Sequence, residues 1–199
     1  MPKILSSELP YLVGYYGYIT MPGFVIGILF RDFIKYGNNF PALVVFPGFL
    51  VFNQGINGIL KQICRQSRPD NQINIVANDS KTNNKMGMPS GHAQSVTFAL
   101  TYLLYSQNNA YLNSIGIITS GLTIAQRLIY RKHTPLQVLV GSTIGTIIGY
   151  GAFKVSKLIS VKPTVLTIIT AVALVPLSFY VDHYNFVERH FISLLKRDD

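Results

Sequence analysis

Six long runs without a charged residue dominate this sequence and limit its possible folds more than any other feature. They cover residues 11–30, 40–60, 89–106, 110–126, 134–153 and 163–181. A helix needs about 20 mainly apolar residues to cross a bilayer, and about 17 are tolerated. The first, second, fifth and sixth runs meet this length, whereas the third and fourth are marginal because polar residues lie near their ends.

The same runs argue against a water-soluble helical bundle. Such a bundle shows polar residues at helical period on every helix, and FPALVVFPGFLVFNQGINGIL and PTVLTIITAVALVPLSFYV do not. Only 13% of the 199 residues are charged, against roughly 25% in soluble domains. We therefore predict an all-α fold, a single domain over residues 1–199 that is a bundle of six transmembrane helices.

The ends of the chain and its cysteine add little to this prediction. The N-terminus lacks a clean basic region and cleavage site, so we expect no cleaved signal peptide. Cys64 is the only cysteine, which excludes an internal disulfide.

An even number of spans places both chain ends on one side of the membrane. Segments 61–88 and 127–133 then share the side of the chain ends, while 31–39, 107–109 and 154–162 lie on the other. The notable polar residues all fall in or beside the first two segments. We therefore expect a functional site at one membrane interface.

Three clusters of basic residues and histidines lie there. In the first, KQICRQSRPD, six residues separate Lys61 from Arg68, and Pro69 prevents a helix from continuing. A cytosolic flank that follows the positive-inside rule is the alternative explanation for these cations. Upstream, Asn53 and Asn57 share a helical face with Lys61. We expect these two amides to join neighbouring helices by hydrogen bonds.

The second cluster, Pro89-Ser90-Gly91-His92, ends a polar loop where the third run begins. Ser90 suits an N-cap, and Gly91 allows a ligand to approach the backbone closely. A helix N-terminus offers unpaired N–H groups and a positive dipole end, which together bind anions. His92 could donate or accept a proton beside it. An ordinary cap with an interfacial histidine is the alternative.

The third cluster, AQRLIYRKHTPLQVLVG, places Arg127 six residues before His133. Thr134, Pro135 and Gln137 fit the N-cap, first-turn and third-turn positions of a helix with a capping box. A purely capping role is the alternative for Gln137. No such alternative explains all three clusters on one membrane face.

Two histidines, three cations and a helix N-terminus describe a phosphate-transfer site. Lys61, Arg68 and Arg127 would neutralise the nonbridging oxygens in the transition state. One imidazole can attack phosphorus, and the other can protonate the leaving oxygen and later activate water. The only acids in the loops on this side are Asp70 and Asp79. We therefore expect a reaction that needs no metal and no other cofactor.

In this order, Lys61-x6-Arg68-Pro69, Pro89-Ser90-Gly91-His92 and Arg127-x5-His133 resemble the three-part signature of the type 2 phosphatidic acid phosphatase superfamily. The resemblance implies that His133 is the nucleophile and His92 the acid and base. It also implies a set of phosphate-binding residues: Lys61, Arg68, Ser90, Gly91 and Arg127.

Two positions depart from the family pattern. Gln126 stands where the family usually has Ser, and Gln137 where it usually has an Asp that orients the imidazole. Glutamine can accept a hydrogen bond but brings no charge. Residues 53–69, 87–94 and 133–138 resemble dolichyldiphosphatases, which carry Gln at the second position. Their substrate is a diphosphate, whose phosphorylated leaving group is a more stable anion than an alkoxide.

The predicted function is therefore an integral-membrane phosphatase that converts a polyprenyl (dolichyl-type) diphosphate to the monophosphate through a phosphohistidine. The alternatives are a broader lipid phosphatase acting on phosphatidic acid, and a catalytically silent membrane scaffold or lipid-binding protein. The expected partners are a lipid phosphate or diphosphate and the bilayer. Nucleic acid is not expected despite the net charge of +9, because the basic residues lie between long uncharged runs. The density of basic residues in the opposite short loops favours a site facing a lumen, such as that of the endoplasmic reticulum, or the outside.

Overall fold

The computed structural model describes residues 2–37, 39–73 and 86–160, together with positions 162, 164, 167, 169, 170, 173, 174, 176 and 177. Five α-helices form within these residues: α1 (Pro2–Tyr36), α2 (Phe40–Cys64), α3 (Gly91–Ser106), α4 (Ala110–Ile129) and α5 (Pro135–Leu158). They correspond to the first five uncharged runs. The sixth run, 163–181, lies largely outside the described residues.

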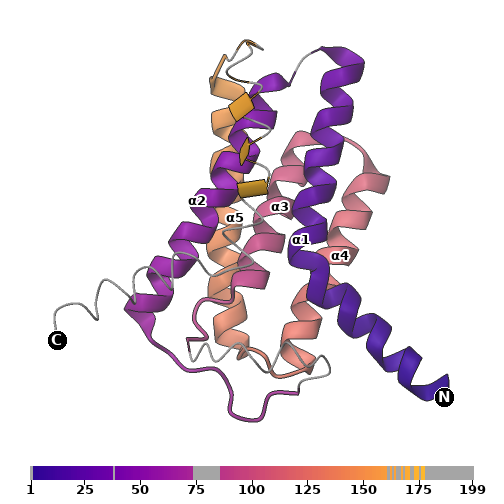
Figure 1. Ribbon diagram of the computed structural model, residues 1–199, viewed down its shortest axis with the longest axis vertical. Helices are drawn as coiled ribbons and strands as arrows, with labels where there is room; N and C mark the ends of the chain where they lie inside the picture. Colours follow the sequence, from indigo (N-terminus) through magenta and orange to yellow (C-terminus); the bar gives the residue numbers. More distant parts are fainter. Residues whose placement is uncertain are drawn as a thin grey trace.

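Successive helices run in opposite directions, as the predicted connectivity requires. Figure 1 shows the α2–α3 and α4–α5 connections at the lower end of the bundle. The α1–α2 and α3–α4 links and the end of α5 lie at the upper end. The described parts of the three clusters outside the helices, 65–69, 89–90 and 130–134, therefore share the lower end, which we call the site end.

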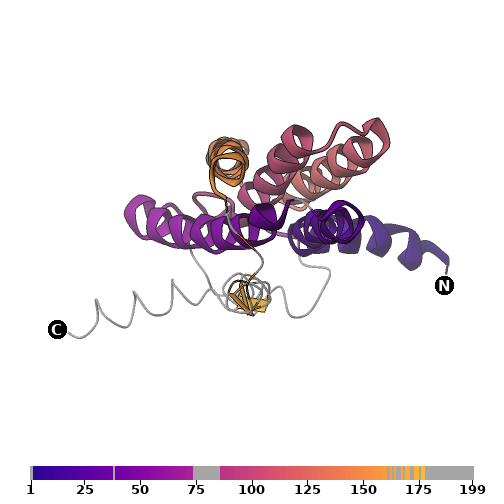
Figure 2. The ribbon, with the colours of Figure 1, turned by 90° about the horizontal axis from the view of Figure 1, so that it is seen from above.

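The helices form two layers, and α3 is the helix that touches all the others. Viewed from above, α1 and α2 lie side by side in one layer, and α5, α3 and α4 form the other (Figure 2). α3 contacts each of the other four helices, and no residue from Gly91 to Leu103 is exposed. Its Phe98 and Tyr102 rings pack against Phe46 of α2, with ring centroids 5.1 and 4.8 Å from that of Phe46, within the apolar core.

A row of glycines brings α5 unusually close to α3. Gly141, Gly145 and Gly149 recur every four residues, so they share one face of α5. A Cβ atom added at any of them would collide with a backbone carbonyl oxygen of α3 or its N-cap, respectively those of Ser90, Gln94 and Phe98. Small residues at such spacing are typical of closely packed membrane helices. The two helices run parallel, and both begin at the site end.

Three helical stretches among the described residues are long and apolar enough to cross a membrane: Gly14–Tyr36, Phe40–Cys64 and Pro135–Leu158. The six predicted spans are thus not confirmed. α3 has only 16 residues, or about 24 Å at 1.5 Å per residue, against a hydrocarbon core of about 30 Å. Outward-facing Phe30, Ile63 and Leu139 are more than half exposed, as expected of side chains that face lipid.

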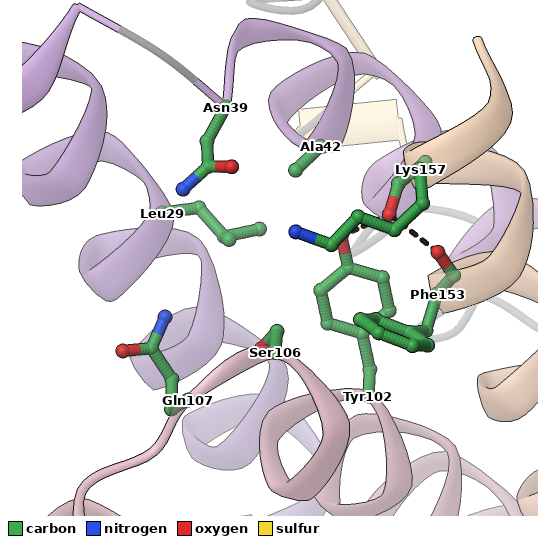
Figure 3. Close-up of a pocket in the computed structure, with 9 residues that line it drawn as sticks. Leu29, Asn39, Ala42, Tyr102, Ser106, Gln107, Phe153 and Lys157 are labelled. Atoms are coloured by element: carbon green, nitrogen blue, oxygen red, sulfur yellow. Dashed lines mark hydrogen bonds between the residues drawn. The ribbon is translucent and has the colours of Figure 1, made fainter.

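A small pocket of about 20 Å³ lies at the upper end of the bundle, opposite the site end (Figure 3). Lys157 and Asn39 point into it. Tyr102 donates a 3.1 Å hydrogen bond to Ser156, and Gln107 donates a 2.9 Å bond to the buried Asp32 carboxylate. The lining of this pocket contains none of the predicted site residues.

The glycine row predicts a position-dependent response to small substitutions in α5. Gly145→Ala forces a methyl group against the Gln94 carbonyl, and such overpacking costs about 1–3 kcal/mol. We expect its unfolding midpoint in detergent to fall by several degrees. Gly151→Ala is the matched control, because nothing lies within 4 Å of its Cβ position, and helix propensity alone stabilises it. Equal midpoints for the two variants would contradict the close packing.

Candidate phosphate-transfer site

Backbone hydrogen bonds join segments of the three clusters at the site end. Ser67 and Met86 form an antiparallel β-bridge, and Gly87 N–H donates to the Gln66 carbonyl at 2.6 Å. Ser90 N–H donates to the Gln137 carbonyl at 3.0 Å. Residues separated by up to 47 positions along the chain, Ser90 and Gln137, are therefore fixed to one another by the backbone.

His133 lies in this junction, in the short connection between α4 and α5. Its Nδ1 is 2.9 Å from the Gly87 carbonyl oxygen and 3.2 Å from Gln137 Oε1. Because both oxygens can only accept, Nδ1 carries the proton and Nε2 keeps its lone pair. The imidazole is thus held in the tautomer that a nucleophilic Nε2 requires.

Gln137 holds both the helix start and the imidazole. Its Oε1 accepts from Thr134 N–H at 3.2 Å, and Thr134 Oγ1 accepts from Gln137 N–H at 3.3 Å, which confirms the predicted capping box. Its Nε2 donates to the Ser67 carbonyl at 2.8 Å and to Gln66 Oε1 at 3.2 Å. Since both amide hydrogens point to acceptors, the amide can lie only with Oε1 toward His133. Gln137 can therefore cap α5 and contact the His133 imidazole at the same time, so the two roles do not exclude each other.

The protonation of His133 depends on its surroundings. Burial, followed by the positive charges of Arg68, Arg127 and Lys61, holds the pKa of this imidazole well below its usual value of 6.5. The hydrogen bond with Gln137 opposes this shift only in part. His133 is consequently neutral at neutral pH, as a nucleophile must be.

The second cluster starts α3 as predicted, but its serine does not cap the helix. Ser90 occupies the N-cap position without a side-chain capping bond. Its buried hydroxyl, like His92 Nε2, has no hydrogen-bond partner among the described residues. Beside them, a Cβ at Gly91 would lie 3.2 Å from Asn57 Oδ1, so a larger residue here would crowd the Asn57 amide. Unused polar groups at a helix N-terminus suit an anion.

The amides of α2 bind α3, as the sequence predicted for Asn53 and Asn57. Asn57 Nδ2 donates to Gln94 Oε1 at 2.8 Å. Gln94 Nε2 in turn donates to the Asn53 backbone carbonyl at 2.8 Å and to its Oδ1 at 2.9 Å. This network fixes the start of α3 against the helix that carries Lys61.

The three cations converge on the histidines from different elements. Lys61 lies in the last turn of α2 and Arg127 near the end of α4, and the two residues are only 6% and 2% exposed. Arg68, which lies between α2 and α3, is partly buried. The charges of all three act on His92 as well as on His133. Lys and Arg side chains are rarely buried so deeply, and a bound phosphate group would add negative charge beside all three.

Gln126, which departs from the family pattern, has a visible role. Its Oε1 accepts a 2.6 Å hydrogen bond from Arg127 Nε, so it orients the guanidinium of its neighbour.

Sequence reasoning did not find four further residues of the site. Gly87 and Gln66 act through a backbone carbonyl and an exposed amide, for which residue type gives no signal. Tyr15 and Tyr18 of α1 lie against Arg127 and His92, and contacts between such distant parts of a chain cannot be read from spacing.

Comparison with known proteins agrees with this arrangement. A model of the PAP2 superfamily matches residues 42–161, more than half of the chain. The chain belongs to the PAP2 superfamily. The matched part of this PAP2 chain runs from α2 to just beyond α5 and includes all three clusters. α1 lies outside it.

Curated relatives of this PAP2 chain fall into two named groups. Dolichyldiphosphatase 1 of Rhinolophus ferrumequinum is 26% identical over 155 residues, covering 70% of the chain and 60% of the relative. Lipid phosphate phosphatase epsilon 1, chloroplastic, of Arabidopsis thaliana is 28% identical over 131 residues, covering 62% and 43%. Lipid phosphate phosphatase gamma of the same plant is 28% identical over 149 residues, covering 69% and 61%. The chain thus spans less than two thirds of the length of these relatives. No solved structure matches it.

The hydrogen bonds of Gln137 predict that an amide is needed at this position. Gln137→Glu replaces both donated bonds by contacts between oxygen atoms, and unsatisfied buried groups cost about 1–3 kcal/mol each. We expect a lower unfolding midpoint in detergent. Gln66→Glu adds the same charge but still offers an acceptor to Gln137 Nε2, so it should be milder. If the two variants lose equal stability, charge rather than the amide geometry is responsible.

Proposed function

We propose that this PAP2 protein hydrolyses a polyprenyl (dolichyl-type) diphosphate to the monophosphate and inorganic phosphate. The observation that carries the proposal is the His133 imidazole, whose Nδ1 proton is held by the Gly87 carbonyl within the field of three cations. A neutral imidazole with a free Nε2 lone pair is a nucleophile suited to an anionic phosphoryl group.

In the first step, His133 Nε2 attacks phosphorus while the bond to the leaving oxygen breaks. His92, which carries a proton once the negative charges of the bound substrate offset the cations, gives that proton to the leaving oxygen, and a phosphohistidine remains. Lys61, Arg68 and Arg127 neutralise the nonbridging oxygens. The Ser90 hydroxyl and the N–H groups beside Gly91, at the start of α3, donate to the same oxygens.

In the second step, water attacks the phosphohistidine. His92, now neutral, accepts a proton from the water as the new P–O bond forms and the P–N bond breaks. Inorganic phosphate leaves, and both histidines return to their starting protonation states.

The diphosphate substrate is supported by the amide at Gln137. During attack His133 becomes positive, and a carboxylate would stabilise that charge more than the dipoles of Gln137 and the Gly87 carbonyl do. A polyprenyl monophosphate is a better leaving group than an alkoxide, so the weaker stabilisation suffices. The matches to dolichyldiphosphatase 1 proteins agree with this substrate. A broader lipid phosphatase is the second candidate, favoured by the 28% identity to lipid phosphate phosphatases.

We further propose that the reaction needs no metal ion. Among the residues that the structure describes, amides, hydroxyls and cations rather than carboxylates surround the histidines, and such groups suit a phosphate better than a divalent cation. Within the described ranges, no group of three or more His, Cys, Asp or Glu side chains could hold a metal.

The membrane helices and the relatives indicate a membrane protein, and we propose that the whole chain is one domain with its site at a membrane interface. The opposite end carries Arg31 and Lys35 after the first run and Lys154, Lys157 and Lys162 at the end of α5 and just beyond it. By the positive-inside rule this end is cytoplasmic. The site then faces a lumen or the outside, and the endoplasmic reticulum fits a dolichyl-type substrate.

Phosphate release by the purified protein in detergent tests this function. We expect faster release from dolichyl diphosphate than from phosphatidic acid, no loss of activity with a chelator, and no release by His133→Ala. A preference for phosphatidic acid would favour the broader phosphatase. Failure of the wild-type protein to release phosphate from either lipid would favour the silent scaffold instead.

The lowered pKa of His133 predicts a pH dependence. Only the neutral imidazole attacks, so activity falls as the pH drops through the His133 pKa. Because the surroundings lower that pKa below 6.5, we expect the acid limb of kcat/KM below this value. This fall in kcat/KM should occur at the same pH with both lipids, because it reports a group of the enzyme. A fall caused by ionisation of the substrate would occur at a different pH with each lipid. A pKa above the ordinary histidine value, read from the acid side of this profile with both lipids, would contradict the lowering of the His133 pKa by the three cations.

A further inference from the structure

α1 reaches the site although it lies outside the matched family region. Tyr18 packs its ring on the His92 imidazole, with centroids 4.0 Å apart and planes inclined by 47°. Tyr15, one turn earlier, lies 5.7 Å from the same imidazole, and the Arg127 guanidinium carbon lies 5.3 Å from the Tyr15 ring centroid. Two aromatic rings of α1 thus contact two predicted site residues from two other helices.

Glycines beside these tyrosines hold α1 close to α4. A Cβ at Gly14 would come within 2.5 Å of Gln126 Cβ, and one at Gly17 would collide with the Thr123 hydroxyl. Gly14 therefore provides the space that the long Gln126 side chain needs, and Gln126 in turn orients Arg127. The departure from the family's usual serine is accommodated by α1.

The two histidines are held in different ways. Hydrogen bonds through Nδ1 fix the His133 ring. No hydrogen bond reaches the His92 ring from any part of the chain that the structure describes, and its Nε2 is buried. The orientation of this acid and base must therefore come from packing, to which Tyr18 contributes the closest ring. Small misplacements of catalytic groups can cost about a hundredfold in rate.

Tyr15 acts on the cation in a comparable way. A guanidinium beside an aromatic ring is attracted to the electron-rich face, and the Gln126 oxygen fixes the same guanidinium from Nε. A ring and an amide together restrict the directions in which Arg127 can present its remaining N–H groups.

We infer that Tyr18 and Tyr15 are positioning residues, which hold His92 and Arg127 in the geometry needed for phosphoryl transfer. This inference rests on the proposed function and adds α1 to the machinery of the site. Tyr18 acts through the proton-transferring imidazole, and Tyr15 acts through a phosphate-binding cation.

A double-mutant cycle tests the role of Tyr18. We expect Tyr18→Leu to lower kcat about tenfold or more with KM little changed, and Tyr18→Phe, which keeps the ring, to retain more turnover. In a His92→Ala background, Tyr18→Leu should change the residual rate by less than about twofold, because the group it positions is gone. An equal loss in both backgrounds would show a merely structural effect and overturn the inference.

Phe24→Leu is the matched control. It removes a partly buried ring of α1 that packs on the apolar core away from the histidines. Its effect on the unfolding midpoint should resemble that of Tyr18→Leu, while its kcat stays near that of the wild type. If Tyr18→Leu does not fold, Tyr18→Met, which fills a similar volume without a ring, takes its place in the cycle.

Orthovanadate, a phosphate-shaped anion, tests Tyr15 without turnover. We expect it to raise the unfolding midpoint of the wild-type protein and of Tyr15→Phe, and to raise that of Tyr15→Leu much less. Equal stabilisation of all three overturns the role of Tyr15. A wild-type protein that binds vanadate but hydrolyses no lipid phosphate would refute the proposed function. The vanadate measurement would still test the role of Tyr15, so failure of the function and failure of this inference can be told apart.

Discussion

The parallel contact of α3 with α5 determines where the other parts of the site can lie. Three glycines of α5 face three carbonyl oxygens at the start and along the length of α3, so neither helix can slide or rotate without a collision. The register sets Ser90 against Gln137 and brings two helix N-termini together. Their aligned dipoles and unpaired N–H groups create a positive region, before any side-chain charge is counted.

Around this contact, the protein fixes His133, the proposed nucleophile, with uncharged groups and gathers its cations where we propose that the substrate phosphate binds. His133 is held by a backbone carbonyl and an amide oxygen, and the amide is itself held by two acceptors from the segment after α2. A carboxylate in place of the Gln137 amide could not donate to these two acceptors, and its oxygens would repel them. The departure from the family's usual aspartate is therefore built into the surrounding structure, and it agrees with the proposed diphosphate substrate.

Much of this arrangement could be predicted from the sequence, because it depends on local spacing. The capping box at Thr134 and Gln137 and the polar face of Asn53 and Asn57 follow from helical geometry, and the ordered motifs indicated the family. The contacts of α1 with the site, by contrast, depend on how helices far apart in the sequence pack together, since Tyr18 contacts His92 and Tyr15 contacts Arg127. The six spans stay a prediction: three described helical stretches have the length and hydropathy of a span, and absence of charge alone does not give a helix either property.

α3 shows why hydropathy is a poor guide to the most important helix of such a bundle. Because other helices surround it from Gly91 to Leu103, the bilayer imposes no selection on its side chains. These side chains must instead fit the shapes and polar groups of the neighbouring helices. For this reason the polar Gln94, Ser95 and Thr97 can be buried there. In a helix bundle of this architecture, a lipid-facing position of a peripheral helix can hold any of several apolar residues. The innermost helix is the least lipid-like in composition and the least free to change.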